Sequence, residues 1–103
     1  MINHPSREEI ALALGNILVQ ALRRDPTIIK PECRIFDDLG AESLDILDVR
    51  FRIERTFGFK IEQDEIARYI GEDLTNQQIR DKFTVQSLVD FIEHRLTQSA
   101  QLA

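Results

Sequence analysis

Apolar residues recur every three or four positions along three long segments of this sequence, which is the spacing of one face of an α-helix. The first of these segments predicts a helix over residues 7–23. Ser6 followed by Glu9 is a capping-box pattern at its start, and Asp25-Pro26 closes its end because proline disfavours helical backbone in the residue before it. The side of this helix that we expect to be buried contains Ile10, Leu14, Ile17, Leu18 and Ala21.

A second helix is predicted from Ser43 to Phe57, with Gly58 as its C-terminal stop. It follows a long connection, residues 25–42, which prolines and Gly40 interrupt. Loops of this length in compact domains are usually functional or packed by their own side chains. The core side of the second helix is expected to contain Ile46, Val49, Ile53 and Phe57.

The second helix also has a displaced apolar stripe, which consists of Leu44, Leu47 and Phe51. A helix in a small bundle rarely buries so wide an apolar surface completely. We therefore expect Leu44 and Phe51 at the edge of the core, whereas a buried and an exposed Leu47 are equally compatible with the pattern.

Two short helices are predicted after the second helix, over residues 62–70 and near residues 77–82, and Gly71 stops the first of them. A last long helix begins after Thr84, which is a good N-cap residue. Its expected core positions are Val85, Leu88, Val89, Ile92 and Leu96. The pattern as a whole predicts an all-α fold, a four-helix bundle with an extra short helix between the second and last long helices.

Length and composition indicate one domain. The 103 residues, of which 43% are apolar, are enough to bury a single core without disulfides or metals. We expect residues 1–103 to form a single domain, with frayed tails at residues 1–5 and 98–103. No apolar run is long enough to span a membrane, and the first residues lack the apolar segment of a signal peptide. A soluble, cytoplasmic monomer without membrane insertion is therefore expected.

Charge and reactive residues argue against several classes of function. The net charge of −5 disfavours nucleic-acid binding, because such domains present a basic face to the phosphates. A helix-turn-helix DNA-binding protein would fit the helix count but not this charge. The single cysteine, Cys33, rules out an internal disulfide and is interpreted as a partly buried loop residue. His4 lies in a predicted tail and His94 on the outer part of the last helix, so a Ser-His-Asp triad is not expected. Residues 62–65 lack the spacing of a calcium loop, so neither an enzyme nor a metal site is expected.

The most informative segment is Asp38-Leu39-Gly40-Ala41-Glu42-Ser43-Leu44-Asp45, where a turn glycine and acidic residues lead into the second helix. Ser43 stands at the helix start, where backbone N–H groups lack intrahelical partners and the helix dipole favours negative charge. A phosphate ester on this hydroxyl would therefore be favourably placed. The simpler interpretation is that Ser43 or Glu42 only caps the helix, which stabilises it by ~1 kcal/mol.

This segment resembles the prosthetic-group attachment site of acyl carrier proteins, whose pattern is an acidic loop, Leu-Gly, a small residue and Asp-Ser-Leu. Glu42 departs from the pattern, because the family nearly always has Asp there. The resemblance implies an acyl-carrier-like bundle with 4'-phosphopantetheine bound covalently to Ser43 as its cofactor. It also implies that the protein is not an enzyme but carries acyl chains as thioesters in fatty acid or other lipid biosynthesis.

The family works with a phosphopantetheinyl transferase and with synthases or acyltransferases that use acylated carriers, so the resemblance implies these partners. The residues expected to contact them are Asp38, Glu42, Leu44, Asp45, Asp48, Phe51, Arg52 and Arg55. Arg50, Arg52 and Arg55 stand where the family's second helix is typically apolar or acidic. Two interpretations stay open: a charge pattern that selects dedicated partners, or a solvated face with pairs such as Asp48 and Arg52.

The interval 62–82 is longer than in ordinary carriers, and in this it resembles the specialised carriers that hold very long acyl chains for lipid A. The residues expected to line or cover an acyl cavity are then Leu47, Phe51, Phe59, Ile61, Ile66, Tyr69 and Ile70. An extra packed turn without a cavity is the alternative. For the whole protein, the alternative to a carrier is an unmodified, carrier-derived helical adaptor that docks other proteins through Leu44 and Phe51.

Overall fold

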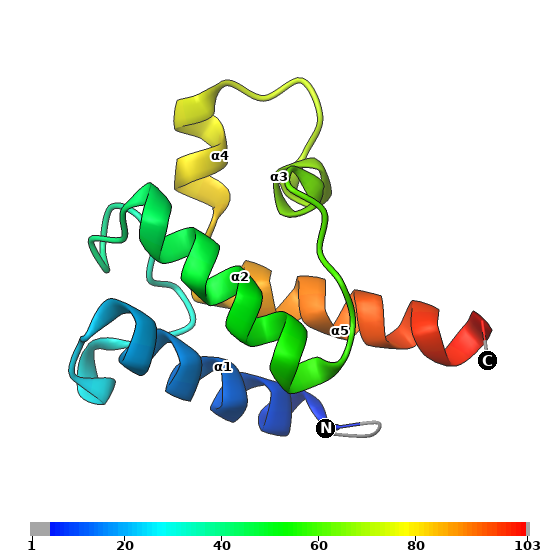
Figure 1. Ribbon diagram of the computed structural model, residues 1–103. Coiled ribbons are helices and arrows are strands. Elements are labelled where there is room, and N and C mark those ends of the chain that lie inside the picture. The colour runs from blue at the N-terminus through cyan, green and yellow to red at the C-terminus, as the bar shows by residue number, and fades with distance from the viewer. Residues whose placement is uncertain (1–4, 103) are drawn as a thin grey trace.

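Three long helices form the body of the molecule in the computed structural model, which describes residues 5–102 and the side chains of residues 5–98. They are α1 (Arg7–Leu22), α2 (Ser43–Phe57) and α5 (Val85–Leu102). α1 packs against both α2 and α5, and the two short helices α3 (Glu65–Ile70) and α4 (Asn76–Lys82) lie on the side of the bundle away from α1 (Figure 1). The described residues contain five α-helices and no strand, which confirms the predicted all-α fold.

The ends of α1 and α2 follow local signals in the sequence. The Ser6 hydroxyl accepts a hydrogen bond from the backbone of Glu9 at 3.2 Å, and the Glu9 carboxylate accepts one from the backbone of Ser6 at 2.8 Å. α1 ends at Leu22, one residue before the predicted end. α2 has the predicted bounds, because Gly58 adopts the left-handed conformation (φ 80°) that ends a helix without a steric cost.

α3 is shorter than predicted. The predicted helix begins at residue 62, but the observed one begins at Glu65, whose carboxylate accepts a hydrogen bond from the backbone of Glu62 at 3.0 Å. Residues 62–64 therefore form the turn that leads into the helix. α4 starts close to the predicted position, after Thr75, whose hydroxyl accepts a bond from the backbone of Gln78 at 3.1 Å.

α5 begins after Thr84 as predicted, and Thr84 and Ser87 exchange side-chain to backbone hydrogen bonds of 2.8 and 3.1 Å there. Its helical backbone continues to Leu102, into the segment 98–103 in which we expect fraying. Residues 1–4 and 103 of the expected tails lie outside the described residues. Fraying therefore stays a prediction at both ends.

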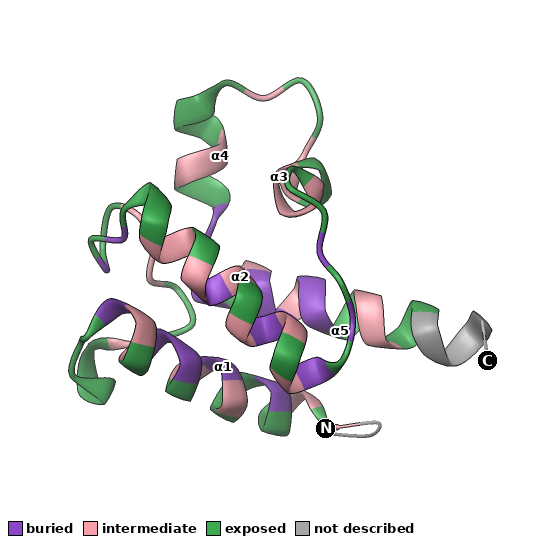
Figure 2. Ribbon diagram, in the orientation of Figure 1, coloured by how far each residue is buried: buried purple, intermediate pink, exposed green. Residues whose placement is uncertain are grey.

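The core lies between α1, α2 and α5, whose facing sides are buried (Figure 2). Two residues of the long loop, Ile35 and Leu39, are buried as completely as the helix positions. Ile46, which the helical pattern assigns to the core, is only partly buried at its edge. The largest fully buried side chains are Ile10, Leu14, Leu18, Ile35, Leu39, Ile53, Leu88, Phe91 and Ile92. Burial of each such side chain contributes roughly 1.5–3 kcal/mol.

The loop between α1 and α2 is tied down along its length. It begins with a short 3₁₀ helix, Pro26–Ile28, and further on the backbone of Ile35 donates a hydrogen bond to the carbonyl of Phe83 at 2.9 Å. In the reverse direction, Val85 donates to the carbonyl of Cys33 at 3.0 Å. These bonds connect the loop to the junction of α4 and α5. Cys33 is partly buried beside the core, as its loop position predicts.

Replacement of Ile53 with alanine is expected to lower the free energy of unfolding by about 2–5 kcal/mol, because Ile53 is fully buried and a cavity would remain. Leu44→Ala, on the same helix but 79% exposed, is the matched control. It should change that free energy by less than about 0.5 kcal/mol. Urea unfolding followed by circular dichroism measures both values. Equal losses in the two variants would contradict the described core.

Candidate functional site

Ser43 is the first residue of α2, and its side chain is exposed. The residue before it, Glu42, is the N-cap of the helix, and the backbone of Glu42 donates a hydrogen bond to the Asp45 carboxylate at 2.9 Å. The capping interpretation therefore applies to Glu42, with Asp45 as its partner. The Ser43 hydroxyl is not used as the cap.

The loop before Ser43 is positioned by an arginine and a glycine. Arg24, just after α1, donates from Nε to the carbonyl of Leu39 at 2.9 Å. Gly40 follows with φ 71°, and a Cβ at this residue would lie 2.9 Å from the Arg24 guanidinium. The left-handed backbone is what favours a glycine here, since the guanidinium is the mobile end of a side chain that can shift. These contacts set the path of the chain into α2.

Asp38, one of the expected partner contacts, has a structural role in this loop. Its carboxylate accepts hydrogen bonds from the backbone of Arg34 at 2.7 Å and from the Arg34 guanidinium at 3.2 Å. The side-chain bond, and then the backbone bond, lower the pKa of Asp38 below its usual value. Asp38 therefore stabilises the loop in its ionised form.

A groove of about 320 Å³ opens beside Ser43, between α2 and the two short helices. Its polar lining residues are Ser43, Arg50 and Gln63. Its apolar lining residues are Phe36, Ile46, Leu47, Ile66, Ala67, Ile70, Ile79 and Phe83. α2, α3 and α4 each contribute part of this lining, so the groove exists only where the three helices meet.

The outer wall of the groove is made by α3 and α4, neither of which has a fully buried residue, although Ile66 and Ile70 of α3 pack partly buried against the core. α3 is attached to α5 by the ion pair of Arg95 with Glu65 and by the ring of Tyr69, which packs on an aromatic ring of α5 at a centroid distance of 5.5 Å. α4 is attached to the long loop by the ion pair of Arg80 with Asp37 at 3.1 Å. Segments with few buried contacts open at a lower free-energy cost than core helices.

The structure places three of the seven expected cavity residues in this groove, and they are Leu47, Ile66 and Ile70. The groove also uses residues that the sequence pattern did not assign to it, among them Phe36, Arg50, Gln63, Ile79 and Phe83. Phe36 and Phe83 lie outside the α-helices, where no periodicity indicates a face. Their ring centroids are 5.7 Å apart, a contact that only the tertiary structure reveals.

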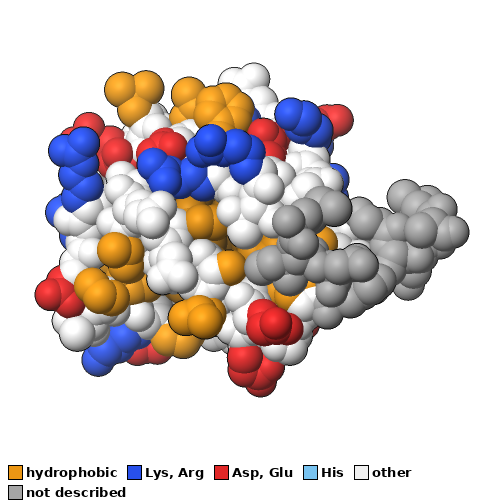
Figure 3. Space-filling model, turned by 60° about the horizontal axis from the view of Figure 1, so that its bottom comes forward, with side chains coloured by type: hydrophobic (Ala, Val, Ile, Leu, Met, Phe, Trp, Pro, Cys, Tyr) orange, Lys and Arg blue, Asp and Glu red, His pale blue; other side chains and the backbone are white. Residues whose placement is uncertain are grey.

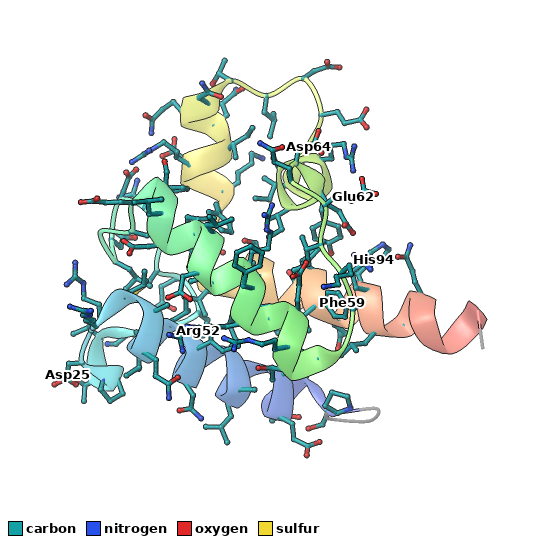
Figure 4. The ribbon with its side chains drawn as sticks, in the orientation of Figure 1. Asp25, Arg52, Phe59, Glu62, Asp64 and His94 are labelled. Atoms are coloured by element: carbon teal, nitrogen blue, oxygen red, sulfur yellow. The ribbon has the colours of Figure 1, made fainter. Side chains whose placement is uncertain are left out.

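The other four expected cavity residues lie outside the groove. Phe51 and Phe59 line a separate, more open hollow at the C-terminal end of α2. Ile61 is buried in the core, and Tyr69 packs on α5. Phe59 lies beside α5, where its ring meets an aromatic ring at a centroid distance of 6.5 Å (Figure 4).

The exposed side of α2 carries apolar and charged residues together. Leu44 is 79% exposed and Phe51 is 47% exposed. Leu47, for which both positions were compatible with the pattern, is 40% exposed. Glu42 and Arg55 are exposed as well. This surface therefore combines an apolar strip with charges of both signs.

Two of the expected partner residues, Asp48 and Arg52, are paired with each other at 2.9 Å. Arg52 also donates to Gln20 of α1 at 3.0 Å, so its side chain points along the bundle toward α1 (Figure 4). Acidic and basic side chains are mixed in small groups over the face shown in Figure 3. For Asp48 and Arg52, the pairing favours the solvated-face interpretation.

Across residues 5–102, no helix combines the length and the apolar character that a bilayer crossing needs. The described part of the chain also has no group of three or more His, Cys, Asp or Glu side chains placed to hold a metal ion. His94 is exposed on α5 and packs on the ring of Tyr69, with 5.3 Å between centroids (Figure 4).

Residues 13–71 match the family model described as the phosphopantetheine attachment site. The acyl carrier protein of Thermotoga maritima is 31% identical over 91 residues, which cover 88% of this chain and 96% of that protein. The acyl carrier protein of Coprothermobacter proteolyticus is 32% identical over 90 residues, or 87% of this chain and 94% of that protein. Acyl carrier protein AcpXL of Rhizobium meliloti is 37% identical over 59 residues, which cover 57% of this chain and only 62% of that protein.

Asp38→Asn is expected to destabilise the protein at neutral pH, because it removes the carboxylate that accepts the backbone and guanidinium hydrogen bonds from Arg34. Since folding lowers the pKa of Asp38, its contribution is complete above the unfolded-state value of about 4 and is lost as the pH falls through the folded-state pKa. The difference in thermal midpoint between wild type and variant should therefore shrink as the pH falls below about 4. Thermal unfolding at several pH values measures it, and a constant difference would contradict the pairing.

Proposed function

Because this chain belongs to the acyl carrier protein family, we propose that it carries 4'-phosphopantetheine on the hydroxyl of Ser43. The family model that matches residues 13–71 is defined by attachment of this prosthetic group. Ser43 lies within the matched residues, at the position that the family motif reserves for the modified serine. The chain is accordingly proposed to work as a carrier of acyl groups.

The observation that carries this proposal is the exposed Ser43 hydroxyl at the start of a 15-residue helix, beside an apolar groove. The first turn of a helix presents free N–H groups and the positive end of the helix dipole, which together stabilise a phosphate. Because Glu42 and Asp45 form the helix start, the hydroxyl is not needed for capping. The start of α2 can therefore accommodate a phosphopantetheine group on Ser43.

When bound, the prosthetic group supplies a terminal thiol on which an acyl chain is held as a thioester. The residues of the groove, Ile46, Leu47 and Ile66 among them, would bind the hydrocarbon and exclude water. Each Å² of apolar surface removed from water stabilises the bound chain by about 25 cal/mol. Because α3 and α4 contain no fully buried residue, they are the part of the wall that can move to admit or release a chain.

In this proposal the protein is a substrate of other enzymes and not an enzyme itself. A phosphopantetheinyl transferase modifies Ser43, and synthases or acyltransferases of fatty acid or other lipid biosynthesis use the acylated form. The exposure of Leu44 and Phe51 supports a docking surface on α2 for these partners. The exposed charges of Glu42 and Arg55 would act on partner choice and association rate more than on affinity.

The alternative function is an unmodified adaptor that docks proteins through Leu44 and Phe51. The exposure of both side chains is compatible with it, and Glu42 departs from the family's Asp. An adaptor has no need of a free hydroxyl beside an apolar groove. This combination at Ser43 is the feature that favours the carrier.

Incubation of the purified protein with coenzyme A and a phosphopantetheinyl transferase tests the attachment. We expect wild-type protein to gain the mass of one phosphopantetheine group and Ser43→Ala to gain nothing, because the accepting hydroxyl is absent. Ser6→Ala is the matched control, since Ser6 also stands at a helix start, and it should still gain one group. Intact-mass spectrometry measures each product.

Two results would contradict this assignment. A gain of mass in Ser43→Ala would place the group on another residue. No gain in wild-type protein would favour the adaptor. Circular dichroism spectra of the three proteins, which should be the same, separate a lost hydroxyl from a lost fold.

A further inference from the structure

Among the described residues that line the groove beside Ser43, Arg50 alone is charged. Its Nε atom is shielded from solvent and has no hydrogen-bond partner within the described part of the chain. Arg52, two residues further along the same helix, is by contrast paired with Asp48. Arg50 therefore brings an unused hydrogen-bond donor into a mainly apolar surrounding.

An unpaired donor in such a place is costly. A guanidinium stays charged at physiological pH and has five N–H donors in one plane. The guanidinium carbon of Arg50 lies 5.4 Å from the centroid of the Phe51 ring, which is a cation–π contact. This contact does not give the Nε–H group a hydrogen-bond acceptor. Since a shielded polar group without a partner is destabilising, an occupant of the groove that moves the side chains covering Nε aside and offers this atom an oxygen is favoured over one that does not.

The position of Arg50 relates this donor to whatever Ser43 carries. Arg50 follows Ser43 by seven residues, so the two share one side of α2 at about 10 Å from each other along its axis. Ile46 and Leu47, between them in sequence, add apolar side chains to the same groove. The amide groups of the prosthetic arm would find few partners in this lining. A hydrocarbon chain with one oxygen substituent matches an apolar groove that has one charged donor.

We propose that Arg50 is a specificity-determining residue, which selects acyl chains with an oxygen substituent over unsubstituted chains. The substituent is a hydroxyl, keto or carboxylate oxygen that accepts a hydrogen bond from Nε–H of Arg50. This inference rests on the proposed carrier function of Ser43. A hydrogen bond to a charged donor corresponds to a preference of about tenfold or more.

The test compares proteins loaded at Ser43 with different acyl chains through a stable amide in place of the thioester. One chain is an unsubstituted octanoyl group, and the others bear a hydroxyl at successive positions, a keto group or a terminal carboxylate. Urea unfolding measures the ratio of folded to unfolded protein for each. We expect at least one oxygenated chain to raise this ratio about tenfold or more above the octanoyl value.

Arg50→Met retains a long side chain and removes the donor, so the advantage of the oxygenated chain should disappear in this variant. Arg23→Met is the matched control, because Arg23 is exposed at the end of α1 and does not line the groove. It should keep the full advantage. The same advantage in Arg50→Met as in wild type would overturn the role of Arg50 and point to another groove residue.

A second measurement uses only the wild-type chain and does not require Arg50→Met to fold. In ¹H–¹⁵N NMR spectra, the Nε–H signal of Arg50 should shift when the oxygenated chain replaces octanoyl. It should not shift when the arm alone is attached. A shift with the arm alone would overturn the proposal, because the arm would then be the acceptor.

The outcomes separate this inference from the function on which it rests. Equal folded-to-unfolded ratios for all loaded chains would overturn the selectivity of Arg50 and leave the carrier function standing. Failure of the transferase to load Ser43 would overturn both.

Discussion

Burial of Ile35 and Leu39 is the constraint on which the rest of the site depends. Both residues belong to the long loop between α1 and α2, yet they are as buried as the core positions of the helices. Their burial holds the loop against the bundle, where Arg24 bonds to the Leu39 carbonyl and Gly40 turns the chain toward α2. Ser43 consequently stands exposed at a helix start. The buried core therefore sets the position of Ser43, although Ser43 itself lies at the surface.

The groove beside Ser43 depends on a weaker kind of interaction. α3 and α4 have no fully buried residue, and they are held by the partly buried Ile66 and Ile70, by aromatic contacts and by ion pairs such as that of Arg80 with Asp37. Ion pairs at the surface contribute about 0–1 kcal/mol each. A firmly packed body and a loosely attached wall suit a site that has to admit and release a chain. Arg50 lies in this groove, and within the described residues its shielded Nε atom has no hydrogen-bond partner.

Local signals were sufficient to predict most helix ends. The pair of Ser6 and Glu9 opens α1, and Gly58 closes α2, because caps and left-handed glycines act within a few residues of themselves. The start of α3 was predicted three residues too early. There the Glu65 carboxylate accepts a hydrogen bond from the backbone of Glu62, a capping contact that leaves residues 62–64 as a turn before the helix.

The all-α fold, the family resemblance and the candidacy of Ser43 follow from the amino-acid sequence, because helical periodicity, caps and the motif at residues 38–45 are all local along the chain. Which apolar residues share a cavity depends on how the helices pack. Leu47 and Ile66 meet in the groove, whereas Phe51 and Tyr69, apolar by the same pattern, lie elsewhere. A groove is a property of the packing between helices, and spacing within one helix does not specify which neighbour its sides will face.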